Sequence, residues 1–216
     1  MTLDLSLYLV TDSAQIAAAG NDPVDAVAAA AVDGGVTVVQ VREKHAPARQ
    51  VLEFVEALSA CLPDRVGIIV NDRVDVFLAA RERGARVTGV HVGQRDVPVE
   101  TVRALVGPEA VIGVSAGTVD HLAAAARGSV DYVGIGPVHA TTSKADAADP
   151  IGVDRAAQLA GTVPLPAVAI GGLGPNDVAP LRSGGLDGVA VVSYICGAPD
   201  PRAAAAELAA QWPERG

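Results

Sequence analysis

Two acidic positions follow apolar segments of this sequence at points where β-strands are predicted to end. Asn71-Asp72 follows the run Val66–Val70, and Asp96 follows Val87–Val92 through Gly93-Gln94-Arg95. Two carboxylates at one rim would suit Mg²⁺, which proteins usually hold through one or two aspartates together with phosphate oxygens. Both residues could instead be helix N-caps, because aspartate is favoured at that position. The sequence leaves the two interpretations open.

The segment Gln40-Val41-Arg42-Glu43-Lys44 closes another predicted strand. Side chains alternate along an extended chain, so Gln40, Arg42 and Lys44 are expected to point the same way. Two cations and an amide on one face would form an anion clamp. A solvated strand end with scattered charges is the plainer alternative.

Hydroxyl groups follow two later strands. Ser115 ends the run Val111–Val114, and Thr141-Thr142-Ser143-Lys144 follows Tyr132–Ile135 after a short loop. No Asp–His pair lies at a spacing that would make Ser115 a nucleophile, so we expect it to donate a hydrogen bond to a ligand. The hydroxyls and Lys144 could bind phosphate, although many such loops are simply polar.

The last two strands end in Gly171-Gly172 and in Val192-Ser193. Glycine lets a phosphate approach the backbone, and amides after the last two strands form the phosphate site of many barrels. Glycines needed only for turn geometry are the alternative. Among the histidines, His139 lies near this region and merits a test, whereas His91 is expected to be a packed, hydrogen-bonded residue.

The elements that must position these residues alternate between short β-branched runs and alanine-rich helical stretches. Their near-continuous apolar character is typical of a parallel sheet covered on both faces. Eight such units predict an α/β fold, a (β/α)₈ TIM barrel with one domain spanning residues 1–216. A barrel with seven strands or a flavodoxin-like sheet remains an alternative. The predicted strands are Leu5–Val10, Val36–Val41, Val66–Val70, Val87–Val92, Val111–Val114, Tyr132–Ile135, Ala167–Ile170 and Gly188–Val192.

Turn and capping signals mark where the predicted helices begin. Asp22-Pro23 and Asp96-Val97-Pro98 resemble an N-cap followed by a proline in the first turn, and Gly174-Pro175-Asn176-Asp177 opens another helix. In a barrel, the residues that follow the strands gather at one mouth, where barrel chemistry takes place. The polar residues at the predicted strand ends follow that rule.

Composition excludes several function classes. The 216 residues carry 16 basic and 25 acidic side chains, a net charge of −9, and 3% aromatic residues. Such a chain is poorly suited to nucleic acid or to anionic membranes. Apolar runs are too short for a membrane span, and Cys61 and Cys196, each in an apolar stretch, are expected to be buried thiols. We expect a soluble cytoplasmic protein, and whether it forms a homo-oligomer is left open.

The ordered motifs together resemble the thiamine phosphate synthase family along nearly the whole chain. Gln40–Lys44 is similar to its Gln-Leu-Arg-Glu-Lys signature, with Val41 in place of leucine. The other matching segments, in order, are Tyr8–Asp12, Asn71–Asp75, His91–Asp96, Gly113–Ser115, Gly136–Lys144 and Ile170–Gly172.

The resemblance implies a transferase of thiamine biosynthesis acting on two small phosphorylated substrates. It would join 4-amino-2-methyl-5-hydroxymethylpyrimidine diphosphate to a thiazole (carboxy)phosphate, giving thiamine monophosphate and diphosphate. The resemblance places Mg²⁺ on Asp72 and Asp96. It places the pyrimidine diphosphate on Gln40, Val41, Arg42, Glu43, Lys44, Asn71, Ser115 and Lys144, with Arg42, Lys44, Ser115 and Lys144 as catalytic residues. It places the thiazole phosphate on Thr141, Thr142, Ser143, Gly172, Val192 and Ser193.

Three departures from the family pattern stand out. His139-Ala140 replaces an aromatic–proline pair, which puts the closure of the following loop in doubt. Ser143 stands where threonine is usual but keeps a hydroxyl. The segment around Arg81–Arg86 is expected to be longer than usual, and the register of the fourth strand depends on it.

Two other functions fit parts of the pattern. A related thiazole tautomerase shares the barrel and the phosphate site, and a non-catalytic barrel could bind a thiazole phosphate as a regulatory sensor. Neither function needs a pair of metal carboxylates. The presence of both Asp72 and Asp96 therefore favours the synthase.

Overall fold

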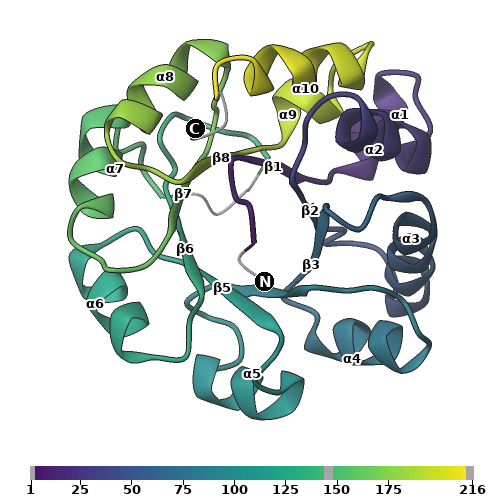
Figure 1. Cartoon of the computed structure of the whole chain (residues 1–216), viewed down its shortest axis with the longest axis horizontal. Helices are drawn as coiled ribbons and strands as arrows, with labels where there is room; N and C mark the ends of the chain where they lie inside the picture. Colours follow the sequence, from purple (N-terminus) through teal and green to yellow (C-terminus); the bar gives the residue numbers. More distant parts are fainter. Residues whose placement is uncertain (1–2, 144–147, 213–216) are drawn as a thin grey trace.

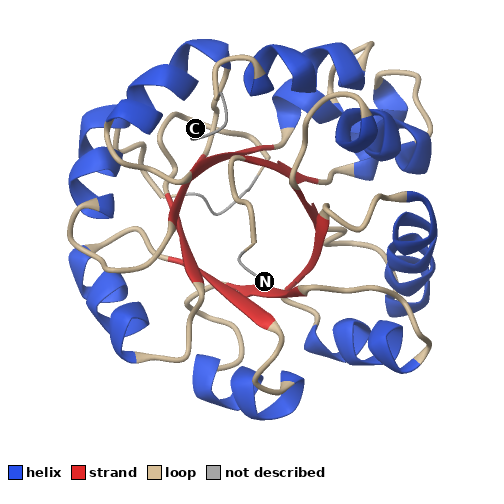
Figure 2. Cartoon of the chain, in the orientation of Figure 1, coloured by secondary structure: helices blue, strands red, loops and turns tan. Residues whose placement is uncertain are grey.

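A computed structural model of the chain, which describes residues 3–143 and 148–212, is a closed barrel of eight parallel strands. The strands form an inner ring in the order β1 to β8, and helices surround it (Figures 1 and 2). Each of the eight predicted strands is present, so the seven-strand and flavodoxin-like alternatives are wrong. The strands are β1 (Leu7–Val10), β2 (Val38–Val41), β3 (Gly67–Asn71), β4 (Gly89–Val92), β5 (Val111–Ser115), β6 (Tyr132–Ile135), β7 (Ala167–Ile170) and β8 (Gly188–Val191).

The helices lie outside the strands and bury one face against them. Two predicted starts are confirmed: Asp22 caps the helix that begins at Pro23, and Gly174 precedes the helix that begins at Pro175. The predicted start at Asp96 is wrong, because Pro98 is the N-cap and the helix begins at Val99. The helices are α1 (Ser13–Ala18), α2 (Pro23–Val32), α3 (Ala48–Cys61), α4 (Val74–Glu82), α5 (Val99–Val106), α6 (Val119–Arg127), α7 (Val153–Ala160), α8 (Pro175–Ser183), α9 (Ser193–Cys196) and α10 (Pro201–Ala209).

Burial divides the apolar side chains into two layers. The larger layer lies between strands and helices, and the smaller one fills the inside of the barrel. Leu3 and Leu5, which precede β1, pack against the inner layer, and the N-terminal segment crosses the ring in Figure 1. Cys196 is buried as expected, but Cys61 is exposed because it occupies the solvent-facing end of α3. None of the helices within residues 3–143 and 148–212 is long and apolar enough to cross a membrane.

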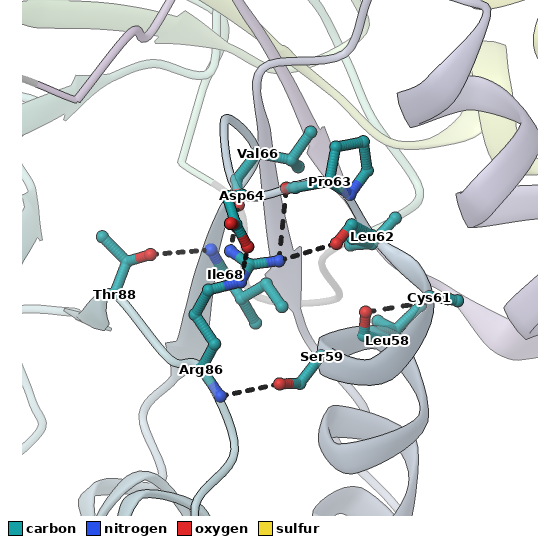
Figure 3. A network of polar contacts seen from close by, with 10 residues as sticks. All are labelled: Leu58, Ser59, Cys61, Leu62, Pro63, Asp64, Val66, Ile68, Arg86 and Thr88. Atoms are coloured by element: carbon teal, nitrogen blue, oxygen red, sulfur yellow. Dashed lines mark hydrogen bonds and ion pairs between the residues drawn. The ribbon is translucent and has the colours of Figure 1, made fainter.

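Arg86 fixes the segment that precedes β4, which is expected from the sequence to be longer than usual (Figure 3). Its guanidinium donates to the carbonyl oxygens of Leu62 at 2.9 Å, Pro63 at 3.2 Å and Val66 at 2.8 Å, and its backbone N–H donates to Ser59 Oγ at 2.6 Å. These bonds tie the approach to β4 to the end of α3 and the start of β3. The register of the fourth strand is thereby defined.

Candidate active site

Two carboxylates meet at the carboxyl ends of β3 and β4. Burial, followed by the charge of the neighbouring Asp96 and a hydrogen bond with it, raises the pKa of Asp72 to about 6. Asn71, through a hydrogen bond, and Lys44, through its charge, act in the opposite direction. Four residues from three distant segments of the sequence therefore lie together at the mouth of the barrel.

Backbone geometry explains how the pair is held. Asp72 has a φ of 57°, a conformation uncommon outside glycine, and its N–H donates to the carbonyl of His91 at 2.8 Å. Asp96 Oδ2 accepts from the N–H of Gly93 at 2.7 Å and closes the turn after β4. The N-caps of the following helices are Arg73 and Pro98, so the interpretation of both aspartates as N-caps is wrong.

The donor set suits an octahedral oxygen-loving ion. Within the described residues, no group of three or more His, Cys, Asp or Glu side chains is placed to enclose a metal. A structural zinc site would need such a group. Magnesium needs only one or two carboxylates, because it keeps water and takes phosphate oxygens as its other ligands. The adjacency of two like charges, Asp72 and Asp96, is the electrostatic condition that a divalent cation relieves.

The segment after β2 departs from the expected alternation. Gln40 lies within β2 and donates a hydrogen bond to Tyr8 inside the barrel. β2 ends at Val41, so Arg42 and Lys44 belong to the loop that follows. Lys44 nevertheless comes close enough to influence Asp72. Arg42 is half-buried at the start of the loop.

The other two residues of this segment have structural contacts. Val41 is buried in the layer beneath the helices, which leaves its backbone rather than its side chain for a ligand. Glu43 accepts hydrogen bonds from Thr11 Oγ1 at 2.9 Å and from Ser13 Oγ at 2.8 Å. These bonds brace the loop against the end of β1.

Two loops that were expected to bind phosphate lie side by side. His139 N–H donates to the carbonyl of Gly171 at 2.9 Å, which joins the loop after β6 to the end of β7. Gly171 and Gly172 have φ values of 109° and 62°, and a Cβ on Gly172 would lie 2.7 Å from the carbonyl oxygen of Ala140. Glycine is therefore required at both positions.

The remaining residues of this half of the site are placed as follows. Ser143 N–H donates to Thr141 Oγ1 at 3.2 Å, and Thr142 is exposed. Val192 is half-buried and Ser193, at the start of α9, is exposed at the end of the strand next to β7. Lys144 lies outside the described residues.

A hydrogen-bonded layer inside the barrel was not foreseen from the sequence. Gln40 Nε2 donates to Tyr8 Oη at 2.8 Å, and Tyr8 Oη lies 2.7 Å from Tyr132 Oη. Tyr132 Oη lies 2.9 Å from His91 Nδ1, and His91 Nε2 lies 3.0 Å from Ser115 Oγ. The expectation that His91 is packed and hydrogen-bonded is confirmed.

Gly113 makes room for this layer, and Gly134 borders it. A Cβ on Gly113 would overlap the Tyr132 ring, and a Cβ on Gly134 would lie 3.4 Å from His91 Cε1. The available sequence signal was the alternation of strand residues, which places Tyr8 on the same face as Val10 and Tyr132 on the same face as Gly134. Aromatic residues at inward positions opposite glycine would have pointed to it.

Comparisons with known proteins agree with this geometry. The family model described as "Thiamine monophosphate synthase" matches residues 7–195. The thiamine-phosphate synthases of Azorhizobium caulinodans and Xanthobacter autotrophicus are 45% and 46% identical; the alignments cover 95% and 96% of this chain and 93% and 95% of those proteins. The solved thiamine phosphate pyrophosphorylase of Pyrococcus furiosus is 32% identical with a TM-score of 0.84, over 97% of this chain and 96% of that one. The chain therefore belongs to the thiamine monophosphate synthase family.

Proposed function

We propose that the chain is a Mg²⁺-dependent thiamine-phosphate synthase that joins a pyrimidine diphosphate to a thiazole phosphate. The observation that carries the proposal is the contact between Asp72 and Asp96, with Asn71 and Lys44 beside them, at the mouth of the barrel. A tautomerase or a thiazole-phosphate sensor has no use for paired carboxylates. The curated relatives described above are named as synthases, which agrees with this choice.

The reaction breaks one bond and forms one. The bond between the pyrimidine methylene carbon and the diphosphate oxygen breaks, and its electron pair leaves with diphosphate. The lone pair of the thiazole nitrogen then forms a C–N bond to the methylene carbon. No proton has to be removed from that nitrogen, so the reaction needs no general base.

The residues of the mouth supply what this reaction requires. A bound Mg²⁺ on Asp72 and Asp96 would stabilise negative charge on the departing diphosphate. Lys44 and Arg42, with Lys144, add positive charge to the same group, and Asn71 and Ser115 hold it through hydrogen bonds. Gln40 to Lys44 are assigned to the pyrimidine side, with Val41 contributing its backbone.

The thiazole phosphate is assigned to the neighbouring loops. Thr141, Thr142 and Ser143 would donate hydroxyl hydrogen bonds to it, and Gly172, Val192 and Ser193 would supply backbone and hydroxyl groups from the ends of β7 and β8. Holding both substrates at one mouth adds rate through proximity.

Diphosphate release is the decisive assay. Purified protein is mixed with both substrates and Mg²⁺, and released diphosphate is followed with a coupled pyrophosphatase. We expect release that requires both substrates and is lost when the metal is chelated. Isomerisation of the thiazole phosphate without the pyrimidine substrate would instead favour a tautomerase, and binding without turnover would favour a sensor.

A further inference from the structure

The hydrogen-bonded layer inside the barrel joins the two sides of the mouth. It runs from Gln40 on β2 through Tyr8, Tyr132 and His91 to Ser115 on β5. Tyr8, Tyr132 and His91 are 1%, 2% and 9% exposed, so their polar atoms must find hydrogen-bond partners within the protein. Burying polar groups is costly unless each is paired, and a wrong proton placement would leave one of them unpaired.

The Gln40 amide at one end of this row of hydrogen bonds determines which atom donates in each of them. The Gln40 amide nitrogen can only donate, so Tyr8 Oη accepts from it and must turn its own hydrogen toward Tyr132 Oη. Tyr132 Oη then accepts from Tyr8 and must donate to His91 Nδ1. Burial raises the pKa of both tyrosines, so each keeps the single hydrogen that this count requires.

The same count determines the tautomer of His91. A nitrogen that accepts a hydrogen bond cannot carry a proton, so a neutral imidazole in this arrangement carries its proton on Nε2 and donates it to Ser115 Oγ. The Ser115 hydroxyl, already an acceptor, must direct its own hydrogen away from His91. β5 ends at Ser115, which places this hydroxyl at the carboxyl end of the strand, on the side of the mouth.

We propose that Tyr8, Tyr132 and His91 are positioning residues that orient the Ser115 hydroxyl as a hydrogen-bond donor to the diphosphate-bearing substrate. The inference rests on the proposed function, because that function gives the donor its acceptor. An anionic diphosphate has oxygen acceptors to offer, and a serine that pointed its hydrogen inward would face it with lone pairs. The amide of Gln40 on one side of the barrel thus determines the orientation of the Ser115 hydroxyl on the other side.

The tautomer of His91 can be measured directly in the protein without substrates. The ¹⁵N resonances of the imidazoles are recorded by long-range ¹H–¹⁵N NMR, and loss of one set in His91→Gln identifies those of His91 among the four histidines. We expect Nδ1 at an unprotonated position and Nε2 at a protonated one. In Tyr8→Phe the direction is no longer enforced, so both resonances should move toward the average of the two tautomers.

The chain offers a matched control. Tyr194, the third tyrosine, donates to Glu207 at 2.5 Å outside the barrel, so Tyr194→Phe should leave the His91 resonances unchanged. In turnover, Tyr132→Phe should lower kcat/KM for the pyrimidine diphosphate about three- to tenfold, the range of one hydrogen bond, while KM for the thiazole phosphate stays constant. A purely structural role would affect both substrates alike.

The outcomes separate this inference from the proposed function. A proton on Nδ1 of His91 in the wild-type protein would overturn the inference about the hydrogen-bond direction. His91 resonances that are unaltered in both Tyr8→Phe and Tyr132→Phe would overturn it as well. The wild-type spectrum decides the direction even if a variant fails to fold. A protein that shows the expected tautomer but releases no diphosphate would refute the proposed function and leave the hydrogen-bond direction intact.

Discussion

His139 Nε2 lies 2.8 Å from Asp177 Oδ1, and this contact joins the loop after β6 to the first turn of α8. The other carboxylate oxygen of Asp177 accepts from the N–H of Gly174 at 2.9 Å, so one side chain both caps α8 and holds the loop. The His139-Ala140 pair, which departs from the family pattern, therefore has an anchor of its own. The base of the loop is fixed without a proline at position 140.

Removing this contact should weaken binding of the thiazole phosphate. In His139→Ala, the loop that carries Thr141 to Ser143 loses its side-chain tie to α8 and keeps the backbone bonds of Val138 and His139 to the end of β7, so we expect KM for the thiazole phosphate to rise about three- to tenfold. KM for the pyrimidine diphosphate should not change. Stability should fall by less than about 1 kcal/mol, because His139 is 43% exposed.

His139→Gln is the matched control, since its amide can still donate to Asp177. Steady-state kinetics with each substrate varied in turn would check the prediction. Equal losses in the alanine and glutamine variants would show that the hydrogen bond is not what holds the loop.

Neutralising either carboxylate of the pair should abolish activity without harming the fold. We expect Asp72→Asn and Asp96→Asn to lower diphosphate release by about two orders of magnitude or more, since charge stabilisation of the leaving group is lost. Two adjacent carboxylates repel each other, so the melting temperature in the absence of metal should stay equal or rise. Titration calorimetry should show loss of Mg²⁺ binding.

The control for this experiment is Asp75→Asn, a surface carboxylate paired with Arg73. It should retain activity and Mg²⁺ binding. Normal turnover in both Asp72→Asn and Asp96→Asn would eliminate the metal assignment.

A methyl group at position 113 should disturb the interior layer. The Cβ of Gly113→Ala would overlap the Tyr132 ring, which must then move away from Tyr8 and His91. Overpacking of this kind costs about 1–3 kcal/mol, so we expect a lower denaturation midpoint together with reduced turnover. Gly161→Ala, at a φ of −66° with no backbone neighbour closer than 3.6 Å, should be neutral. Equal stability of the two variants would contradict the assigned packing.

Alkaline pH should unfold the protein through its buried acids. Burial raises the pKa of Cys196 from 9.0 to about 12, and it raises those of Tyr8 and Tyr132 above 10.0. The unfolded chain therefore loses these protons first, so their stabilising contribution is complete below about pH 9 and declines as pH rises from there. Each group should lower the free energy of unfolding by about 1.4 kcal/mol for every pH unit above its unfolded-state pKa.

Denaturant titrations between about pH 8 and about pH 11 would measure this slope. Tyrosinate absorbance should reveal one tyrosine that ionises in the folded state and two that ionise on unfolding. Ionisation of all three tyrosines before unfolding would contradict the raised pKa values of Tyr8 and Tyr132.

The sequence predicted the barrel well because its signal is repeated. Eight apolar runs, each followed by a helical stretch, specify a closed parallel sheet even when single boundaries shift, as at Val38 instead of Val36. It also predicted that Asp72 and Asp96 share a rim, since the carboxyl ends of neighbouring parallel strands always do. Both results follow from topology rather than from side-chain detail.

The directions of side chains in loops were harder to predict from the sequence. The alternation expected through Lys44 has no strand beyond Val41, where β2 ends, and the position of Glu43 is given only by its hydrogen bonds with Thr11 and Ser13. The contact of His139 with Asp177 spans 38 residues and depends on how two loops meet in space. Such pairings arise only after the barrel has closed.

Leu3 and Leu5 close the amino-terminal end of the barrel interior. Both lie at the amino ends of the strands and pack beneath Tyr8, Ile69 and Val111, so in the described chain that end of the barrel is plugged by side chains. The apolar side chains of Leu3 and Leu5 therefore shield the buried polar layer from water at the amino end, on the side opposite the carboxyl ends of the strands where barrel chemistry takes place.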